Sequence, residues 1–175
     1  MRLVSLRPAA LAALAMLLAG CLVSEKPLFD ATTAVTPIAA GRHEKQQMEE
    51  GRWSNVKLGT LKLEGRLYQW KVDDEEEVSR FSLYSVGKDS FVVHSVKEES
   101  GKPSNYYALI QQTPEGFVIY QPSCAELVKV RMPARLRPKV VKENSFFTDR
   151  VILTEVLTFY ANVMEPELRF VQAKR

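Results

Sequence analysis

From residue 41 to residue 132 the chain consists of short segments in which apolar and polar residues alternate, and turn-forming residues separate each segment from the next. Alternation with a period of two is typical of β-strands that bury one face. Because the turns recur about every eight to twelve residues, the pattern predicts a mainly β chain: an antiparallel meander of about six to nine short strands that forms a small barrel or a sandwich. The expected strands are residues 42–48, 53–58, 60–63, 67–72, 80–86, 91–96, 106–112, 117–120 and 127–132.

The periodicity changes near residue 149. Apolar and aromatic residues then recur at helical spacing and share one face of a helix; they are Ile152, Val156, Phe159, Tyr160 and Val163. Thr148 is the expected N-cap, Asp149 suits the first turn, and Pro166 limits the far end. The sequence therefore predicts one C-terminal α-helix over residues 149–163, packed across the sheet or its open end. The final residues, 167–175, fit no clear pattern.

The first twenty-one residues indicate export and attachment to a membrane. Arg2 and Arg7 precede an apolar run from Ala9 to Ala19, about half the length that a membrane-spanning helix needs but suited to a signal peptide. The run ends in Leu18-Ala19-Gly20-Cys21, which resembles the lipobox of bacterial lipoproteins. The other interpretation is an ordinary secretory signal with an incidental cysteine.

The resemblance to bacterial lipoproteins implies cleavage between Gly20 and Cys21, a thioether-linked diacylglycerol on Cys21, and N-acylation of that residue. In the sorting rule of Gram-negative lipoproteins, Leu22 in place of Asp implies the outer membrane. The expected location is thus the outer membrane, lipid-anchored and facing the periplasm. No cofactor is expected besides this covalent lipid.

Three sections of chain follow from this interpretation: a signal peptide over residues 1–20, a lipidated tether over 21–40, and a single mainly β domain with its helix over 41–175. Pro27 and Pro37 favour an extended conformation in the tether. Leu28 and Phe29 are large for a free linker, so they either dock on the domain or remain in solvent.

Charge and cysteine content exclude some classes of protein. The chain has 24 basic and 21 acidic residues. Cleavage of the signal peptide would remove Arg2 and Arg7, so the mature chain is nearly neutral, and its charge gives no indication of a nucleic-acid-binding protein. If Cys21 carries lipid, Cys124 has no partner within the chain, and stability must come from packing.

Few residues suggest catalysis. Cys124 and His94 could form a thiol–base pair, but Cys124 is expected between strands, without the helix N-terminus that favours a thiolate, and His94 is expected to be a buried histidine with a hydrogen-bonded partner. Only His43 and His94 could supply imidazole, without metal-ligand spacing. No catalytic residue and no metal site is therefore predicted.

One segment is strongly basic. Lys129, Arg131, Arg135, Arg137, Lys139 and Lys142 occur without an acidic residue among them. Arg131, Arg135, Arg137, Lys139 and Lys142 are the candidates for contact with an anionic partner, such as an envelope protein or an anionic glycolipid. The alternative is a solvated loop that the acidic run 73–77 partly neutralises.

A second resemblance is weaker. Gly51-Arg52-Trp53, together with the meander and the late helix, is similar to bacterial lipocalins, which would imply an eight-stranded barrel that carries a small apolar ligand. The chain lacks the later Thr-Asp-x-x-Tyr signature of that family. The sequence thus favours a non-enzymatic binding or structural module of the cell envelope, with a lipocalin-like carrier second and a thiol enzyme using Cys124 third. A filled barrel interior would favour the binding module, and a wide apolar interior the carrier.

Overall fold

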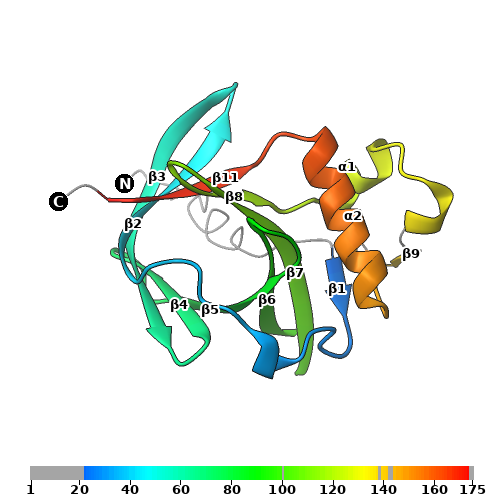
Figure 1. The fold of residues 1–175 in the computed structure, drawn as a ribbon, viewed down its shortest axis with the longest axis horizontal. Coiled ribbons are helices and arrows are strands. Elements are labelled where there is room, and N and C mark those ends of the chain that lie inside the picture. The colour runs from blue at the N-terminus through cyan, green and yellow to red at the C-terminus, as the bar shows by residue number, and fades with distance from the viewer. Residues whose placement is uncertain (1–21, 100, 138, 142–143, 174–175) are drawn as a thin grey trace, which may run out of the picture.

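Eight antiparallel strands close into a barrel in the computed structural model, which describes residues 22–99, 101–137, 139–141 and 144–173 (Figure 1). Each barrel strand pairs with the next barrel strand along the chain, and pairing of the last strand, β11, with the first, β2, closes the ring. The predicted meander is confirmed, and it forms a barrel rather than a sandwich. Its strands are β2 (Gly41–Glu49), β3 (Arg52–Glu64), β4 (Leu67–Val72), β5 (Val78–Ser85), β6 (Ser90–Glu99), β7 (Lys102–Thr113), β8 (Gly116–Tyr120) and β11 (Leu168–Gln172).

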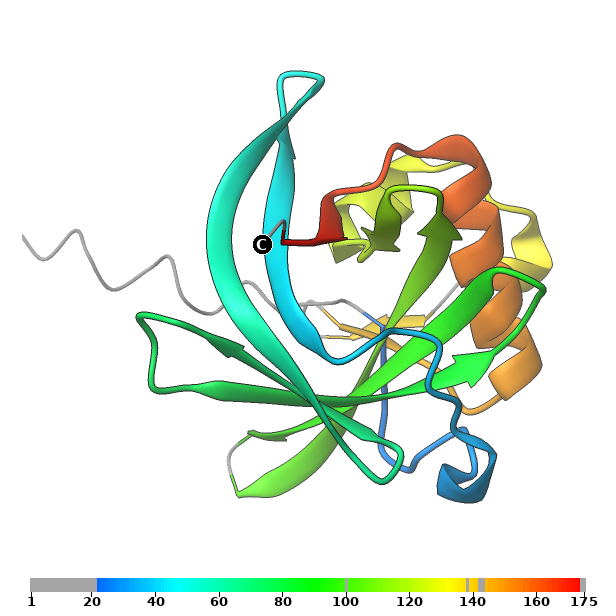
Figure 2. The same ribbon diagram turned by 60° about the vertical axis from the view of Figure 1, so that its left-hand side comes forward.

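The long β2–β3 hairpin extends past its neighbours (Figure 2). The two expected segments 53–58 and 60–63 form one strand, β3, of 13 residues. Lys45 pairs with Lys57 and Gln46 with Asn55, so β3 has one extra residue at this point, and such bulges increase the bend and twist of a strand. This curvature helps the sheet close on itself.

Trp70 fills the middle of the barrel. Its side chain is 1 % exposed, and its ring meets that of Phe170 edge-on at 4.9 Å. Gly59 makes this packing possible, because a Cβ there would lie 2.6 Å from the Trp70 ring and 2.5 Å from the Lys71 carbonyl oxygen. The interior core consists of Ile38, Leu61, Tyr68, Trp70, Val72, Leu83, Phe91, Val93, Ala108, Ile110, Phe117 and Phe170.

A second core lies outside the barrel wall, beneath helix α2 (Arg150–Val163), which packs against β7 and β8 (Figure 1). The predicted helix is confirmed, and its buried residues are Leu153, Val156, Leu157 and Tyr160. The N-cap is Asp149, one residue later than predicted, because its carboxylate accepts hydrogen bonds from the backbone of Val151 and Ile152.

A half-buried carboxylate, that of Glu167, joins this helix to the barrel. The Tyr160 hydroxyl donates to Glu167 Oε1 at 2.7 Å, and the Gln121 backbone amide donates to Glu167 Oε2 at 2.8 Å. Burial raises the pKa of Glu167, and these two hydrogen bonds oppose that effect. The bonds connect the end of β8, helix α2 and the start of β11.

Between β8 and β11 the chain forms an insertion on one side of the barrel. It comprises α1 (Cys124–Lys129), a 3-10 turn (Ala134–Leu136), β9 (Lys139–Val141), β10 (Asn144–Phe146) and α2. The prediction of a strand over 127–132 is wrong. Ser123 and Glu126 form a capping box, which satisfies backbone donors of the first turn and starts a helix instead.

The prediction of a tether is also wrong over residues 22–40, which belong to the domain. Strand β1 (Leu22–Ser24) pairs with both β7 and β10. Phe29, Ala34 and Ile38 are buried, and Phe29 stacks on Tyr84 at 4.8 Å. Of the two alternatives for Phe29, docking on the domain is therefore the observed one.

Candidate functional site

The barrel interior contains one small apolar cavity, of about 50 Å³. A water molecule needs about 10–15 Å³ of such volume, and a cavity of about 150 Å³ holds benzene. The cavity therefore has room for a few water-sized groups but is smaller than one that takes benzene. The cavity is lined by Ile38, Leu61, Trp70, Ser79, Phe81, Val93, Ala108, Ile110, Ile119, Gln121, Leu168 and Phe170.

Two lysines face each other near one mouth of the barrel. Lys45 of β2 lies opposite Lys57 of β3, and Phe170 lies opposite Lys45 on β11. Lys45 is only 6 % exposed. Lys57 forms an ion pair with Glu75, in the loop between β4 and β5. Burial, and then the charge of Lys57, lower the pKa of Lys45 to about 8, although Glu75 partly opposes them.

The acidic run 73–77 pairs with barrel residues rather than with the basic segment. Arg42 forms an ion pair with Asp73 at 2.5 Å, at the rim of the barrel, and Glu75 binds Lys57. Arg135 of the basic segment forms its ion pair with Glu155 of α2 instead. Among the described residues, no ion pair joins this run to the basic segment, and partial neutralisation of the segment by the run stays a prediction.

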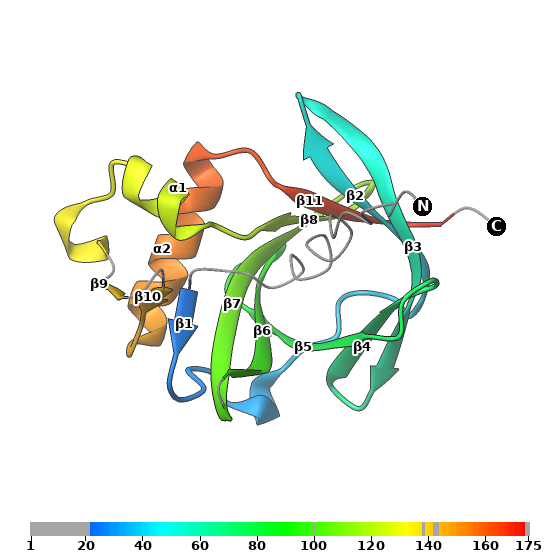
Figure 3. The same ribbon diagram turned by 180° about the vertical axis from the view of Figure 1, so that it is seen from behind.

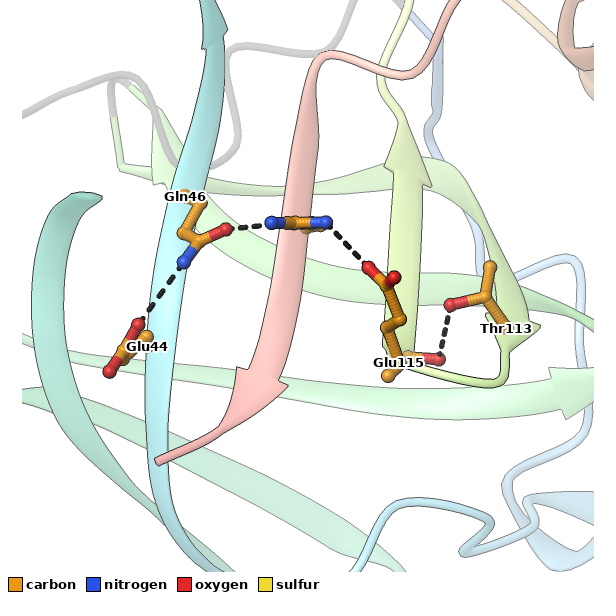
Figure 4. Close-up of polar contacts among 6 residues, drawn as sticks. Glu44, Gln46, Thr113 and Glu115 are labelled. Carbon is orange, nitrogen blue, oxygen red and sulfur yellow. Dashed lines mark hydrogen bonds and ion pairs between the residues drawn. The ribbon is translucent and has the colours of Figure 1, made fainter. Parts of the chain in front are cut away.

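A polar network crosses the outer face of the barrel from β2 to β8 (Figure 4). Arg169 Nε donates to Gln46 Oε1 at 2.5 Å, and Gln46 Nε2 donates to Glu44 Oε2 at 3.1 Å. Arg169 Nη1 donates to Glu115 Oε2 at 2.8 Å, near the turn that Thr113 closes.

Trp53, of the Gly51-Arg52-Trp53 tripeptide, lies in this network rather than in the barrel core. The Arg169 guanidinium lies 4.8 Å from the Trp53 ring centre, and Gly51 occupies the turn of the β2–β3 hairpin with φ of 75°. The tryptophan inside the barrel is Trp70.

His94 belongs to a buried network on the barrel wall, as expected for a core histidine. Its Nε2 lies 2.8 Å from Asn105 Oδ1, and its ring stacks on Tyr107 at 5.2 Å. Asn105 Nδ2 donates to the Ser24 carbonyl, and the Tyr107 hydroxyl lies 2.8 Å from Ser24 Oγ. Burial lowers the pKa of His94, and the Asn105 contact opposes that effect. The network connects β1 to the barrel.

Cys124 begins helix α1, contrary to its expected place between strands. Its Sγ lies 3.7 Å from Ser145 Oγ and is disulfide-bonded. The sequence contains one other cysteine, Cys21, which lies outside the described residues together with Gly20. The sulfur of a disulfide is not a thiolate, and the contacts of His94 are with Asn105 and Tyr107, so the described contacts do not form a thiol–base pair.

The basic segment forms an exposed surface beside α1, which we call the basic face: Lys129, Arg131, Arg135 and Arg137, all exposed. Arg137 also donates to the Met132 carbonyl. The other two candidates are described less fully, since for Lys139 only the backbone, in β9, is described and Lys142 lies outside the described residues. Figure 3 shows α1, β9 and β10 on the same side of the barrel as β1.

A groove of about 410 Å³ separates the start of α2 from the barrel. Phe29 and Tyr84 form its floor, and Arg150 lies over the Phe29 ring at 5.9 Å. The helix contributes Val151, Thr154 and Glu155 to the lining, and Thr33, Ser85 and Val86 complete it. No set of three or more metal-ligating side chains comes together in the described part of the chain.

Reasoning from sequence missed the lysine pair at the barrel mouth. His43 and Lys45 are two residues apart on the inner face of β2, but an inward-facing strand is hard to recognise in a sequence when the residues on its buried face are polar. Among the described helices, none combines the length and apolarity needed to cross a membrane. Comparisons with protein-family models, with curated proteins and with solved structures find no match to this chain.

Proposed function

We propose that this chain is an outer-membrane lipoprotein, anchored through lipid on Cys21, whose barrel domain lies on the periplasmic surface of that membrane and binds there without catalysing a reaction. The observation that carries the proposal is the position of β1. Leu22 is completely buried and already pairs with Ser145 of β10, so the folded domain begins one residue after the lipobox cysteine.

Such an anchor leaves no spacer between lipid and domain. Burial of acyl chain contributes about 0.8 kcal/mol per CH₂ group, and several chains on one residue hold a protein stably. A domain attached in this way must rest against the headgroups, with the side next to β1 facing them.

The basic face is close to that attachment point. Ser145 pairs with Leu22 and lies beside Cys124, the first residue of α1. The helix has six residues and is about 9 Å long. Its last residue, Lys129, therefore lies about that far from Cys124, which is next to the start of β1. Each basic residue near an anionic membrane surface contributes about 1 kcal/mol of attraction. We infer that the basic face binds anionic phospholipid headgroups.

The state of Cys124 gives a chemical test of the anchor, because the thioether proposed for Cys21 and a disulfide between the two cysteines of the chain exclude each other. Lipid-labelled protein should contain one thiol that reacts with an alkylating reagent in denaturant, whereas Cys21→Ser should abolish labelling and release the protein from the membrane fraction. Unchanged lipid labelling of Cys21→Ser would contradict the anchor.

Hydrogen exchange tests the orientation of the domain. In vesicles that contain phosphatidylglycerol, the backbone amides of residues 127–137 should exchange more slowly than in neutral vesicles, and 0.5 M salt should remove the difference. Replacing Arg131, Arg135 and Arg137 with Gln should have the same effect as salt. The control replaces Lys62, Lys71 and Arg80, which are exposed on β3–β5. Protection that appears only with added envelope proteins would indicate an acidic protein partner instead.

A further inference from the structure

Lys45 is a buried amine that forms no ion pair with another described residue. No hydrogen bond or ion pair joins its Nζ to another described residue. The carboxylate whose charge acts on Lys45 is that of Glu75, and this carboxylate forms its ion pair with Lys57. The local group of two lysines and one glutamate therefore carries one excess positive charge. Burial of an unpaired charge is costly, so a counter-ion from outside the chain would stabilise this arrangement.

The lining of the apolar cavity, which does not include the two lysines, extends to the same end of the barrel. In a meander, the end of one strand and the start of the next lie at the same mouth, so the β4–β5 loop that holds Glu75 shares its mouth with the end of β8 and the start of β11. Gln121 and Leu168 of the cavity lining occupy those two positions. Phe170 lines the cavity and faces Lys45 across the β2–β11 ladder.

We propose that this mouth binds a small aliphatic monocarboxylate, with its carboxylate between Lys45 and Lys57 and its chain in the cavity beside Trp70 and Phe170. The cavity of about 50 Å³ accommodates about three to five water-sized groups, which sets the chain at three to five carbons. An inorganic anion would use the lysines without the cavity, and a neutral apolar molecule would use the cavity without the lysines.

The fluorescence of Trp70 provides the readout. The chain has two tryptophans, so the full-length protein with Trp53→Phe leaves Trp70 as the single reporter. We expect affinity at pH 7 to rise about fourfold per CH₂ group from acetate to pentanoate, as expected for burial of about 0.8 kcal/mol per CH₂. Affinity should then level off or fall for hexanoate and octanoate.

Two variants separate the two halves of the site. Lys45→Met should weaken pentanoate binding at least tenfold, whereas the matched control Lys62→Met, exposed on the outside of β3, should leave it unchanged. Ala108→Leu, which fills the cavity from its wall, should weaken pentanoate binding but not acetate binding. Because Lys45→Met removes a buried charge, we do not expect it to unfold the protein.

Binding should also weaken above about pH 8, where Lys45 loses its proton. The other titratable groups beside Lys45 are Lys57, Glu75 and His43, which shares the inner face of β2. The rest of the β4–β5 loop and its ion pair with Arg42 add Asp73, Asp74, Glu76 and Glu77 at the rim. A weakening that persists in Lys45→Met would assign it to one of those groups and overturn the role of Lys45. Equal affinity for butanol and butanoate, equal affinity for acetate and pentanoate, or undiminished binding by Lys45→Met would each overturn the proposal.

Discussion

The barrel mouth and the basic face both carry excess positive charge, but in opposite surroundings. Lys45 is 6 % exposed and lies between Lys57 and the Phe170 ring. Arg131 and Arg137 lie on the surface of the insertion, in solvent. A charge inside a barrel affects stability through desolvation and titrates within an accessible pH range, whereas an exposed charge contributes about 0–1 kcal/mol and is screened by salt.

The comparison shows that burial, rather than charge count, decides what a basic residue can do here. The sequence directs attention to the basic segment because its residues are many and adjacent. The mouth has two lysines 12 positions apart in sequence, which the β2–β3 hairpin brings together. We therefore expect changes at the mouth to alter stability and its pH dependence, and changes on the basic face to alter association and its salt dependence.

The largest expected effect comes from Gly59→Ala, which should disrupt the mouth and leave the basic face intact. A methyl group there would meet the Lys71 carbonyl oxygen at 2.5 Å and the Trp70 ring at 2.6 Å. Overpacking against a fixed backbone costs about 3 kcal/mol. Chemical denaturation should show this loss of unfolding free energy.

Gly87→Ala is the matched control, because a Cβ at Gly87 meets only Ser90, at 3.5 Å. Its stability should lie within about 0.5 kcal/mol of wild type. Equal effects of the two substitutions would show that Trp70 does not pack as described.

Glu75→Gln should have the next largest effect. It removes the carboxylate of a mostly buried ion pair, whose side chains are 14 % (Glu75) and 23 % (Lys57) exposed, and leaves two lysines facing each other. Leaving one buried charge unpaired is strongly destabilising, and we expect about 2–3 kcal/mol after allowance for partial exposure. The double variant with Lys45→Met should recover part of this loss. Additive effects of the two substitutions would contradict an interaction between Lys45 and Glu75.

Lys45→Met should stabilise the protein. The pKa of Lys45 falls from 10.5 to about 8 on folding, which corresponds to a cost on the order of 3 kcal/mol at neutral pH. The unfolded chain binds the proton more tightly, so wild-type stability should rise as pH increases from about 8 toward 10.5, where the cost disappears. The variant should gain about 2 kcal/mol at pH 7 and lack this rise. Denaturation curves at pH 7, 9 and 10 would measure both effects, and a destabilised variant would show that the amine has a partner.

The sequence predicts the regular part of the barrel well, because its strands alternate apolar and polar residues between turns. Strand β4 matches the predicted 67–72, and the helix begins at Arg150, after Asp149 as its cap. Prediction failed where single residues rather than a period determine the structure. Phe29 and Ala34 join the core beneath α2, whereas Ile38 joins the barrel interior, so no repeating pattern marks residues 22–40.

The same reason explains the other differences. Helix α1 depends on one capping box, Ser123 with Glu126, in a segment too short for helical periodicity. Strand β11 has only five residues. Its place between β8 and β2, with Leu168 and Phe170 buried, follows from pairing with those two strands rather than from its own pattern. At the candidate site, Lys45 has a functional interpretation only after Phe170 and Lys57, distant in sequence, are placed beside it.

The smallest expected effect on stability comes from the basic face. Replacing Arg131, Arg135 and Arg137 with Gln should change the unfolding free energy by about 0–1 kcal/mol, since their one ion pair, between Arg135 and Glu155, has side chains 66 % and 38 % exposed. The acidic run has its partners on the barrel, Arg42 and Lys57. When the triple substitution is combined with Asp74→Asn and Glu76→Gln, the changes in unfolding free energy should therefore add to within about 0.5 kcal/mol. This should hold at low salt as well as at 0.1 M salt, where charges are screened over about 10 Å. Coupling at low salt that disappears at 0.1 M would mean that the two runs interact at long range. The basic face would then be partly neutralised by its own chain, and less of its charge would be available to an anionic membrane.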